Sequence, residues 1–338
     1  MAGLSIPKLE EEKYAKKYSE FEKYYDKEMN DVVKEVNKNR IKLVFRGIRD
    51  TVIAIALIYL FFKYNYLLPM IEYAYIGFVI LLITLFIIRR KYRKAKERFI
   101  NQSKSSIIEK LLQFMLPDGF SYDPEMHISR SFLNSNIFER EANEITGDDY
   151  FYGNIGSTSI TFSELNAVER VSNQHTKKRY KIFKGLFYVV DFNKDFDGFL
   201  RVVPGREKSK FKRGFKNLLS KSPFSRFSHL ETVELENPTF MDTFDVRTND
   251  QIMARYILTP AFMERLLAFS TKNRKYKTHF SFYHGTMYLA LATERQHFTF
   301  SMFTMLTKKK VGEYFQDINI ALELVDELNL NLRIWSKE

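Results

Sequence analysis

The chain of 338 residues contains no cysteine, one tryptophan and eight prolines. The absence of cysteine excludes disulfide bonds, thiolate metal ligands and cysteine nucleophiles. A chain without disulfides is compatible with a reducing compartment. Hydrophobic residues make up 45% of the chain and charged residues 28%, so the composition is that of a folded protein rather than a disordered one.

Several motifs that mark enzymes are also missing. The sequence has no GxGxxG or GxxxxGK[ST] phosphate-binding loop, no GxSxG nucleophile elbow and no HExxH helix. The six histidines are scattered, and the five-residue step between His279 and His284 places them on opposite faces of a strand. The sequence therefore predicts no catalytic residue, cofactor or metal site, and an enzyme is not the favoured class.

Aromatic residues and positive charge are abundant. The chain has 32 phenylalanines, 20 tyrosines and a net charge of +12. Phenylalanine and tyrosine favour β-strands and lipid–water interfaces. The excess of cations indicates an anionic partner, either nucleic acid or an anionic lipid surface. Two apolar runs favour lipid over nucleic acid.

These apolar runs extend from Thr51 to Leu68 and from Tyr73 to Ile88, and Pro69 between them marks a turn. Each run approaches the about 20 residues that a membrane-spanning helix needs. The segments Thr51–Phe62 and Tyr73–Ile88 contain no ionisable acid, histidine, lysine or arginine, which favours an anchor over a transporter. We therefore expect a two-helix transmembrane hairpin over residues 47–90, with a buried hairpin in a large core as the alternative.

Basic clusters flank the two runs. They comprise Lys38, Arg40, Lys42, Arg46 and Arg49 before the first run, and Arg89, Arg90, Lys91, Arg93, Lys94, Lys96 and Arg98 after the second. Basic residues remain on the cytoplasmic side of a membrane. We therefore expect a multi-pass protein of the inner (cytoplasmic) membrane with both termini in the cytosol.

Residues 1–46 are predicted to form a cytosolic amphipathic helix that resembles a coiled coil. Aromatic residues recur on it at steps of three and four, at Tyr14, Tyr18, Phe21 and Tyr25. This stripe predicts helix pairing with a partner. Packing of the same stripe on the chain's own domain is an equally good interpretation. Residues 91–143 are expected to form a cytosolic helical connector.

Residues 144–338 are predicted to form a cytosolic α+β domain. A hairpin is expected over Tyr150–Phe162 with its turn near Asn154–Thr158, and later strands include one at Phe298–Phe303. Helices are expected at Asp250–Ser270 and Glu313–Leu328. This order favours an α+β fold with a mixed sheet, or a partly open barrel, capped by the last helix.

Four segments of this domain occur in a characteristic order: Gly147–Gly153, Phe183–Phe187, Phe240–Val246 and Arg255–Met263. Together with the paired apolar helices, they resemble an uncharacterised bacterial membrane-protein family, the domain of unknown function 3137. The resemblance implies two membrane helices and an intracellular C-terminal domain. It supplies no catalytic residues, and it suggests a membrane protein of the LemA type as a candidate partner.

The best acidic pair is Asp148-Asp149, which follows Gly147. Two adjacent carboxylates bind a divalent cation in some sites, and one of them acts as a general base in others. Asx residues beside glycine are also common in turns. A turn before a strand is the favoured interpretation.

A basic segment at Arg206–Lys221 alternates cations with apolar residues. On a helix, its apolar residues share one face with cations around them. The segment is expected to contact anionic lipid or a protein partner, with a solvated loop or nucleic-acid binding as alternatives. The residues expected to make the contact are Lys208, Lys210, Phe211, Lys212, Arg213, Phe215, Lys216 and Lys221.

Three functions are consistent with these features. The favoured one is a membrane-anchored cytosolic interaction or scaffold module. The second is a membrane-surface enzyme that uses an acidic site near Asp148. The third is a component of an oligomeric channel or transport complex, and a homo-oligomer also fits the first function.

Overall fold

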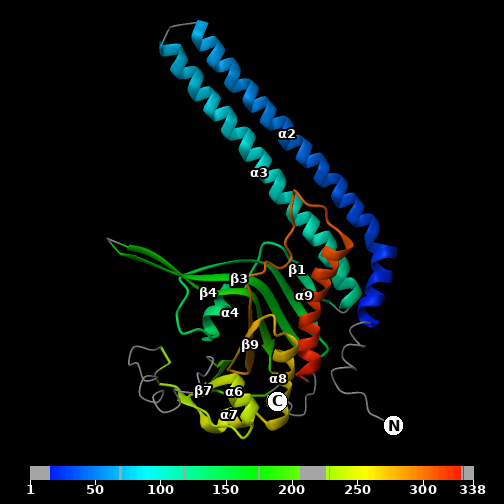
Figure 1. Ribbon diagram of the computed structural model, residues 1–338, viewed down its shortest axis with the longest axis vertical. Helices are drawn as coiled ribbons and strands as arrows, with labels where there is room; N and C mark the ends of the chain where they lie inside the picture. Colours follow the sequence, from blue (N-terminus) through cyan, green and yellow to red (C-terminus); the bar gives the residue numbers. More distant parts are fainter. Residues whose placement is uncertain are drawn as a thin grey trace. The chain divides into compact units, whose positions relative to one another are not determined.

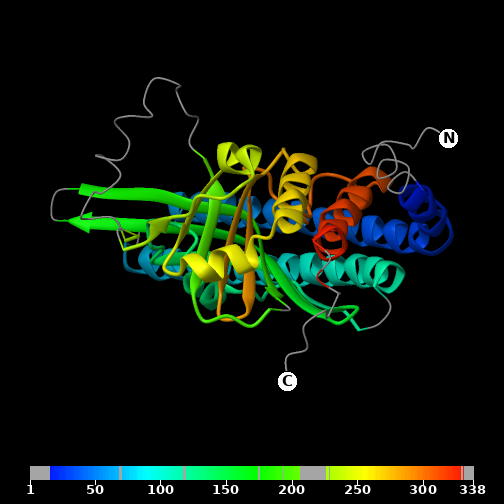
Figure 2. The ribbon, with the colours of Figure 1, turned by 90° about the horizontal axis from the view of Figure 1, so that it is seen from below.

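The computed structural model describes residues 16–67, 71–116, 119–173, 176–192, 194–205, 226–227, 229–328 and 330. The chain divides into two compact units. The first comprises Met1–Phe114 and Thr299–Glu313, and the second comprises Met115–Phe298 and Tyr314–Glu338. Figures 1 and 2 show the elements of both units, and each unit is described by itself.

Two long helices dominate the first unit. Residues 16–24 are helical, a π-helical turn η1 follows at Tyr25–Met29, and the chain continues as α2 (Asn30–Leu67). Helix α3 (Ile71–Met115) runs beside α2 (Figures 1 and 2). Gly47 allows the close approach, because a Cβ atom there would lie 2.7 Å from the ring of Tyr92. From residue 16 onward, the segment predicted as the N-terminal helix and the first apolar run therefore form one continuous helical segment.

No helix among the described residues is long and apolar enough to cross a membrane. The strictly apolar stretches of the two helices are Thr51–Phe62 in α2, a stretch that ends at Lys63, and Tyr73–Ile88 in α3, a stretch that ends at Arg89. Both are shorter than the about 20 residues that a span requires. This finding contradicts the predicted transmembrane hairpin and, with it, the multi-pass localisation in the inner membrane.

The segment Thr299–Glu313 is fixed to α2 by side-chain hydrogen bonds. The Asn37 amide donates to the carbonyl oxygen of Leu306 at 2.9 Å and accepts from the backbone N–H of Leu306 at 3.0 Å. Both bonds are buried. The strand predicted at Phe298–Phe303 is wrong, because this backbone is not paired with a neighbouring strand and bonds to α2 instead.

A nine-stranded sheet forms the second unit, in the order β1-β2-β3-β4-β9-β8-β5-β7-β6. All described neighbouring strands are antiparallel, so the α+β class is confirmed and the mixed sheet is wrong. One reason is that hairpins with short turns join β2 to β3 and β8 to β9, and such hairpins make neighbouring strands antiparallel. The strands are β1 (Ser121–Asp123), β2 (Glu144–Ile155), β3 (Thr158–Asn173), β4 (Thr176–Asp191), β5 (Phe199–Pro204), β6 (Glu231–Thr232), β7 (Phe244–Thr248), β8 (Lys277–Tyr283) and β9 (Thr286–Ala292).

The helix predicted over Asp250–Ser270 is two helices in the structure. Pro260 begins the second one, where a residue without a backbone N–H costs nothing. The side chains of Asp250 and Thr259 cap the two N-termini by accepting backbone N–H groups. Besides η1, α2 and α3, the described helices are α4 (Ser129–Asn134), α6 (Pro238–Thr243), α7 (Gln251–Ile257), α8 (Pro260–Lys272) and α9 (Lys308–Glu327).

Candidate functional site

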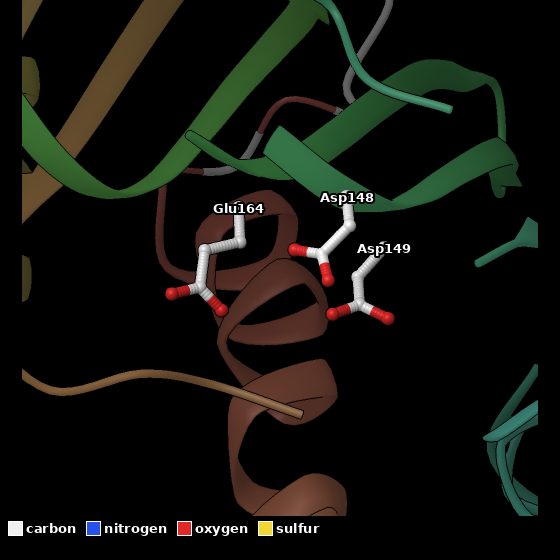
Figure 3. Close-up of side chains that lie close together, drawn as sticks. All are labelled: Asp148, Asp149 and Glu164. Carbon is white, nitrogen blue, oxygen red and sulfur yellow. The ribbon is translucent and has the colours of Figure 1, made fainter. Parts of the chain in front are cut away.

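Three carboxylates meet on one side of the β2–β3 hairpin: Asp148, Asp149 and Glu164 (Figure 3). The register of the two strands places Asp148 opposite Glu164. One ligand oxygen from each side chain lies within 4.8 Å of the others. Asp149 and Glu164 are buried, with exposed fractions of 1% and 8%. We call this group the acidic cluster.

An irregularity in β2 produces the acidic cluster. The β2–β3 register shifts by one residue between Asp148 and Phe151, and Asp149 adopts a left-handed backbone with φ of 57°. Such a bulge redirects side chains that would otherwise alternate between the two faces. Gly147 lets the strands approach, because a Cβ atom there would lie 2.4 Å from the carbonyl oxygen of Glu164. The turn predicted at Asp148-Asp149 is therefore a bulge inside a strand.

Two donors are bound to the acidic cluster. The Tyr122 hydroxyl donates to Oδ1 of Asp149, and the backbone N–H of His297 donates to Oε2 of Glu164 at 2.9 Å. Burial, and then the negative charge of Asp149, raises the pKa of Tyr122 well above its usual range. The hydroxyl therefore keeps its proton and remains a donor to Asp149.

A second group of buried polar side chains adjoins the acidic cluster through His297. The Nδ1 atom of His297 lies 3.0 Å from Oδ2 of Asp317 in α9, and both side chains are fully buried. The guanidinium of Arg295 lies 3.3 Å from the same oxygen. Burial, reinforced by the charge of Asp317, raises the pKa of Tyr276, so that phenol also stays protonated. Acid, imidazole and guanidinium thus form a connected network in the second unit.

The acidic cluster offers the hard oxygen ligands that Mg²⁺, Mn²⁺ and Ca²⁺ prefer. Two of its oxygens already accept hydrogen bonds from Tyr122 and His297. Two surface pockets formed by described residues lie elsewhere: one of about 570 Å³ beside Asp195 and Tyr256, and one of about 250 Å³ beside Thr304. The arrangement provides acid–base groups, and neither of these pockets brings a substrate to them.

Several residues predicted to form contacts lie outside the described part of the chain. These are Tyr14 and the basic segment with Lys208, Lys210, Phe211, Lys212, Arg213, Phe215, Lys216 and Lys221. Of the aromatic stripe, Phe21 and Tyr25 are buried in the first unit, and the ring of Tyr18 lies 5.6 Å from that of Phe21. These contacts are within one chain. Pairing of this stripe with a partner stays a prediction.

Residue patterns alone did not single out Tyr122, Glu164, His297 and Asp317 as members of a site. Glu164 could have been found from the sequence. If residues are paired outward from a hairpin turn at Gly156, Glu164 lies opposite the acidic pair to within one residue. His297 follows β9 and Asp317 lies in α9, so no local spacing in the sequence connects either residue with Glu164. Only the arrangement of the strands brings them together.

His279 in β8 gives a prediction about pH. Burial, followed by the positive charges of Arg201 and Lys277, lowers the pKa of His279 to about 3, against 6.5 in the unfolded chain. The unfolded state therefore binds the proton first, and the free energy of unfolding falls as the pH drops below 6.5. We expect His279 to lower the free energy of unfolding by about 2 kcal/mol at pH 5 relative to pH 7.5.

His279→Phe is expected to remove this loss, since the new ring can pack on Phe138, whose ring lies 5.2 Å from that of His279. The measurement is urea unfolding of both proteins at pH 7.5 and pH 5. His284→Asn is the control, because the His284 side chain is 55% exposed. Equal pH dependence in His279→Phe and the parent protein would contradict the prediction.

Residues 181–330 match a family model described as "Protein of unknown function (DUF3137)". The chain resembles that family. The residues that match the DUF3137 model include His297 and Asp317 and exclude the acidic cluster. The family's description assigns no activity.

Among solved structures, similarity is found to the crystal structure of the mycobacterial trehalose monomycolate transport factor A, TtfA. The TM-score is 0.32 and the sequence identity 9%. The alignment covers 71% of this chain and 99% of the TtfA chain. No curated protein sequence matches this chain.

Proposed function

We propose that the chain is an interaction module whose first unit contacts an anionic lipid surface through helices α2 and α3. The observation that supports this proposal is the exposure of large apolar side chains along both helices. Monomeric soluble proteins rarely expose contiguous apolar patches larger than a few hundred Å². The exposed side chains are Val52, Ile53, Ile55, Ile58, Tyr59, Leu60 and Phe62 in α2, and Tyr75, Ile76, Phe78, Val79, Ile80, Leu82, Ile83, Phe86 and Ile87 in α3.

The charges next to this surface favour lipid over an uncharged partner. Arg46 and Arg49 precede the apolar part of α2, and Arg89, Arg90 and Lys91 follow that of α3. All five residues are exposed. A cation near an anionic lipid surface contributes about 1 kcal/mol. Apolar side chains beside cations are the combination that binds peripheral proteins to lipid, and such binding requires no helix to cross the bilayer.

The test is co-sedimentation of the full chain with vesicles of phosphatidylcholine, alone or mixed with phosphatidylglycerol. We expect tighter binding to the anionic vesicles. The triple variant Arg89→Gln, Arg90→Gln, Lys91→Gln removes about 3 kcal/mol of electrostatic binding free energy. It should therefore weaken binding to the anionic vesicles by on the order of 10²-fold. Binding to phosphatidylcholine alone should change little.

The double variant Ile55→Asp, Ile80→Asp should weaken binding to both kinds of vesicle at least tenfold, because it places charge on the apolar surface. Ile252→Asp is the matched control. Ile252 is an apolar side chain of the second unit with an exposed fraction of 84%, and its replacement should leave binding unchanged. Absence of vesicle binding by the parent protein, or an equal effect of Ile252→Asp, would refute the proposal.

A further inference from the structure

One face of α2 carries an exposed apolar stripe with a heptad period. Its residues follow one another at alternating steps of four and three, which is the spacing of the a and d positions in a coiled coil. Their exposed fractions range from 47% to 66%. The stripe consists of Ile41, Phe45, Ile48, Val52, Ile55, Tyr59 and Phe62.

A different face of α2 contacts α3. Gly47 lies against the ring of Tyr92, and the ring of Phe61 lies 5.9 Å from that of Phe78. Leu43, one turn before Gly47 on the same face, is 7% exposed. Residues 43, 47 and 61 fall at outer heptad positions when Ile41 is assigned to d and Phe45 to a. Helix α2 thus has one face covered by α3 and a second face, of the same periodicity, that is exposed.

We infer that the stripe pairs with the same stripe of a second copy of this chain. Its side chains together expose on the order of 700 Å² per protomer, taking roughly half of the area that a large side chain presents. A standard stable interface buries about 800 Å² per partner. A two-fold pair is the simplest closed assembly, and it covers the stripe on both copies at once.

The charges beside the stripe select a parallel pair. The e positions carry Lys42, Arg49, Ala56 and Lys63, whereas the g positions between them carry Val44, Thr51 and Ile58. In a parallel pair each e residue faces a g residue of the other helix, so each cation meets a neutral side chain. In an antiparallel pair the e residues face one another, so Lys42 of one helix repels Lys63 of the other, whereas Arg49 faces Ala56.

The pairing shares Val52, Ile55, Tyr59 and Phe62 with the surface proposed to contact lipid, whereas the exposed apolar side chains of α3 remain available to lipid. Ile41, Phe45 and Ile48 lie beside Lys42 and Arg46, before the part of α2 that is apolar on all exposed sides, and they belong to the pairing alone. Cross-links at residues 41 and 48 therefore test the pairing separately from vesicle binding. A failure of vesicle binding would leave the pairing untouched.

The absence of cysteine allows a direct test with single cysteines in the full chain. A disulfide requires Cα atoms about 4.4–6.8 Å apart. Under mild oxidation, Ile41→Cys and Ile48→Cys should each form a cross-linked dimer at least tenfold faster than Arg46→Cys. Arg46 is the matched control, because it is exposed two residues from Ile48 and occupies an outer position.

Cross-linking is measured at low protein concentration, with and without vesicles, and the parent protein's mass is measured by light scattering. A dimer mass together with links at residues 41 and 48 supports the parallel pair. Three results overturn the inference: a monomer mass, equal rates for all three cysteines, or efficient links only in a mixture of Phe45→Cys and Phe62→Cys proteins. The last result would indicate an antiparallel pair.

Discussion

Replacing Gly185 with alanine is expected to lower the free energy of unfolding by at least about 3 kcal/mol. Gly185 lies in β4 with φ of +144°, a conformation that L side chains rarely adopt. A Cβ atom there would lie 2.0 Å from the carbonyl oxygen of Leu291 in β9. Since that oxygen belongs to the backbone, the two strands must move apart to admit a methyl group.

Urea unfolding of the full chain measures this loss. Gly119→Ala is the matched control, because Gly119 also has a positive φ, +103°, and a Cβ atom there would meet nothing within 4 Å. Only backbone strain is added at that position, so the expected loss is about 1 kcal/mol. Similar losses in the two variants would show that the contact with β9 is not what requires glycine at residue 185.

Replacing Phe162 with alanine is expected to lower the free energy of unfolding by about 3–5 kcal/mol. The ring of Phe162 is fully buried between those of Phe151 and Tyr188, with centroid distances of 4.4 Å and 4.9 Å. Alanine would remove both contacts and leave a cavity in a sheet that cannot collapse to fill it. The same change should disturb the hairpin that positions the acidic cluster.

Tyr152→Ala is the control for this prediction. Tyr152 lies on the same hairpin, follows Phe151 and is 46% exposed, so its loss should change stability by no more than about 0.5 kcal/mol. Chemical unfolding gives the free energies, and near-ultraviolet circular dichroism reports on the aromatic packing. A loss below about 1 kcal/mol for Phe162→Ala would contradict the prediction.

The sequence predicted elements best where the signal is local. The α+β class and the hairpin with its turn near Gly156 follow from residue periodicity and turn residues. Pro260 illustrates the limit, because a periodic pattern over Asp250–Ser270 predicts one helix where capping residues make two.

The apolar runs of α2 and α3 illustrate a different limit. Their composition predicted a transmembrane hairpin, and the structure finds no described helix that is long and apolar enough. Composition also fails to say which side chains of a run face another helix. The α2 face against α3 and the stripe on its other side differ only by a rotation about the helix axis, which the contacts of Gly47 and Phe61 define.

Residue patterns alone were sufficient to predict the α+β class, and they contain the cationic character and the acidic pair after Gly147. Tertiary structure alone decided that this pair meets Glu164 and that Glu164 connects to His297 and Asp317. The reason is that local periodicity depends on neighbours in the chain. Contacts between distant residues depend on the order of the strands and on a one-residue bulge in β2. The same local residue pattern is compatible with many strand orders and with many positions of a bulge.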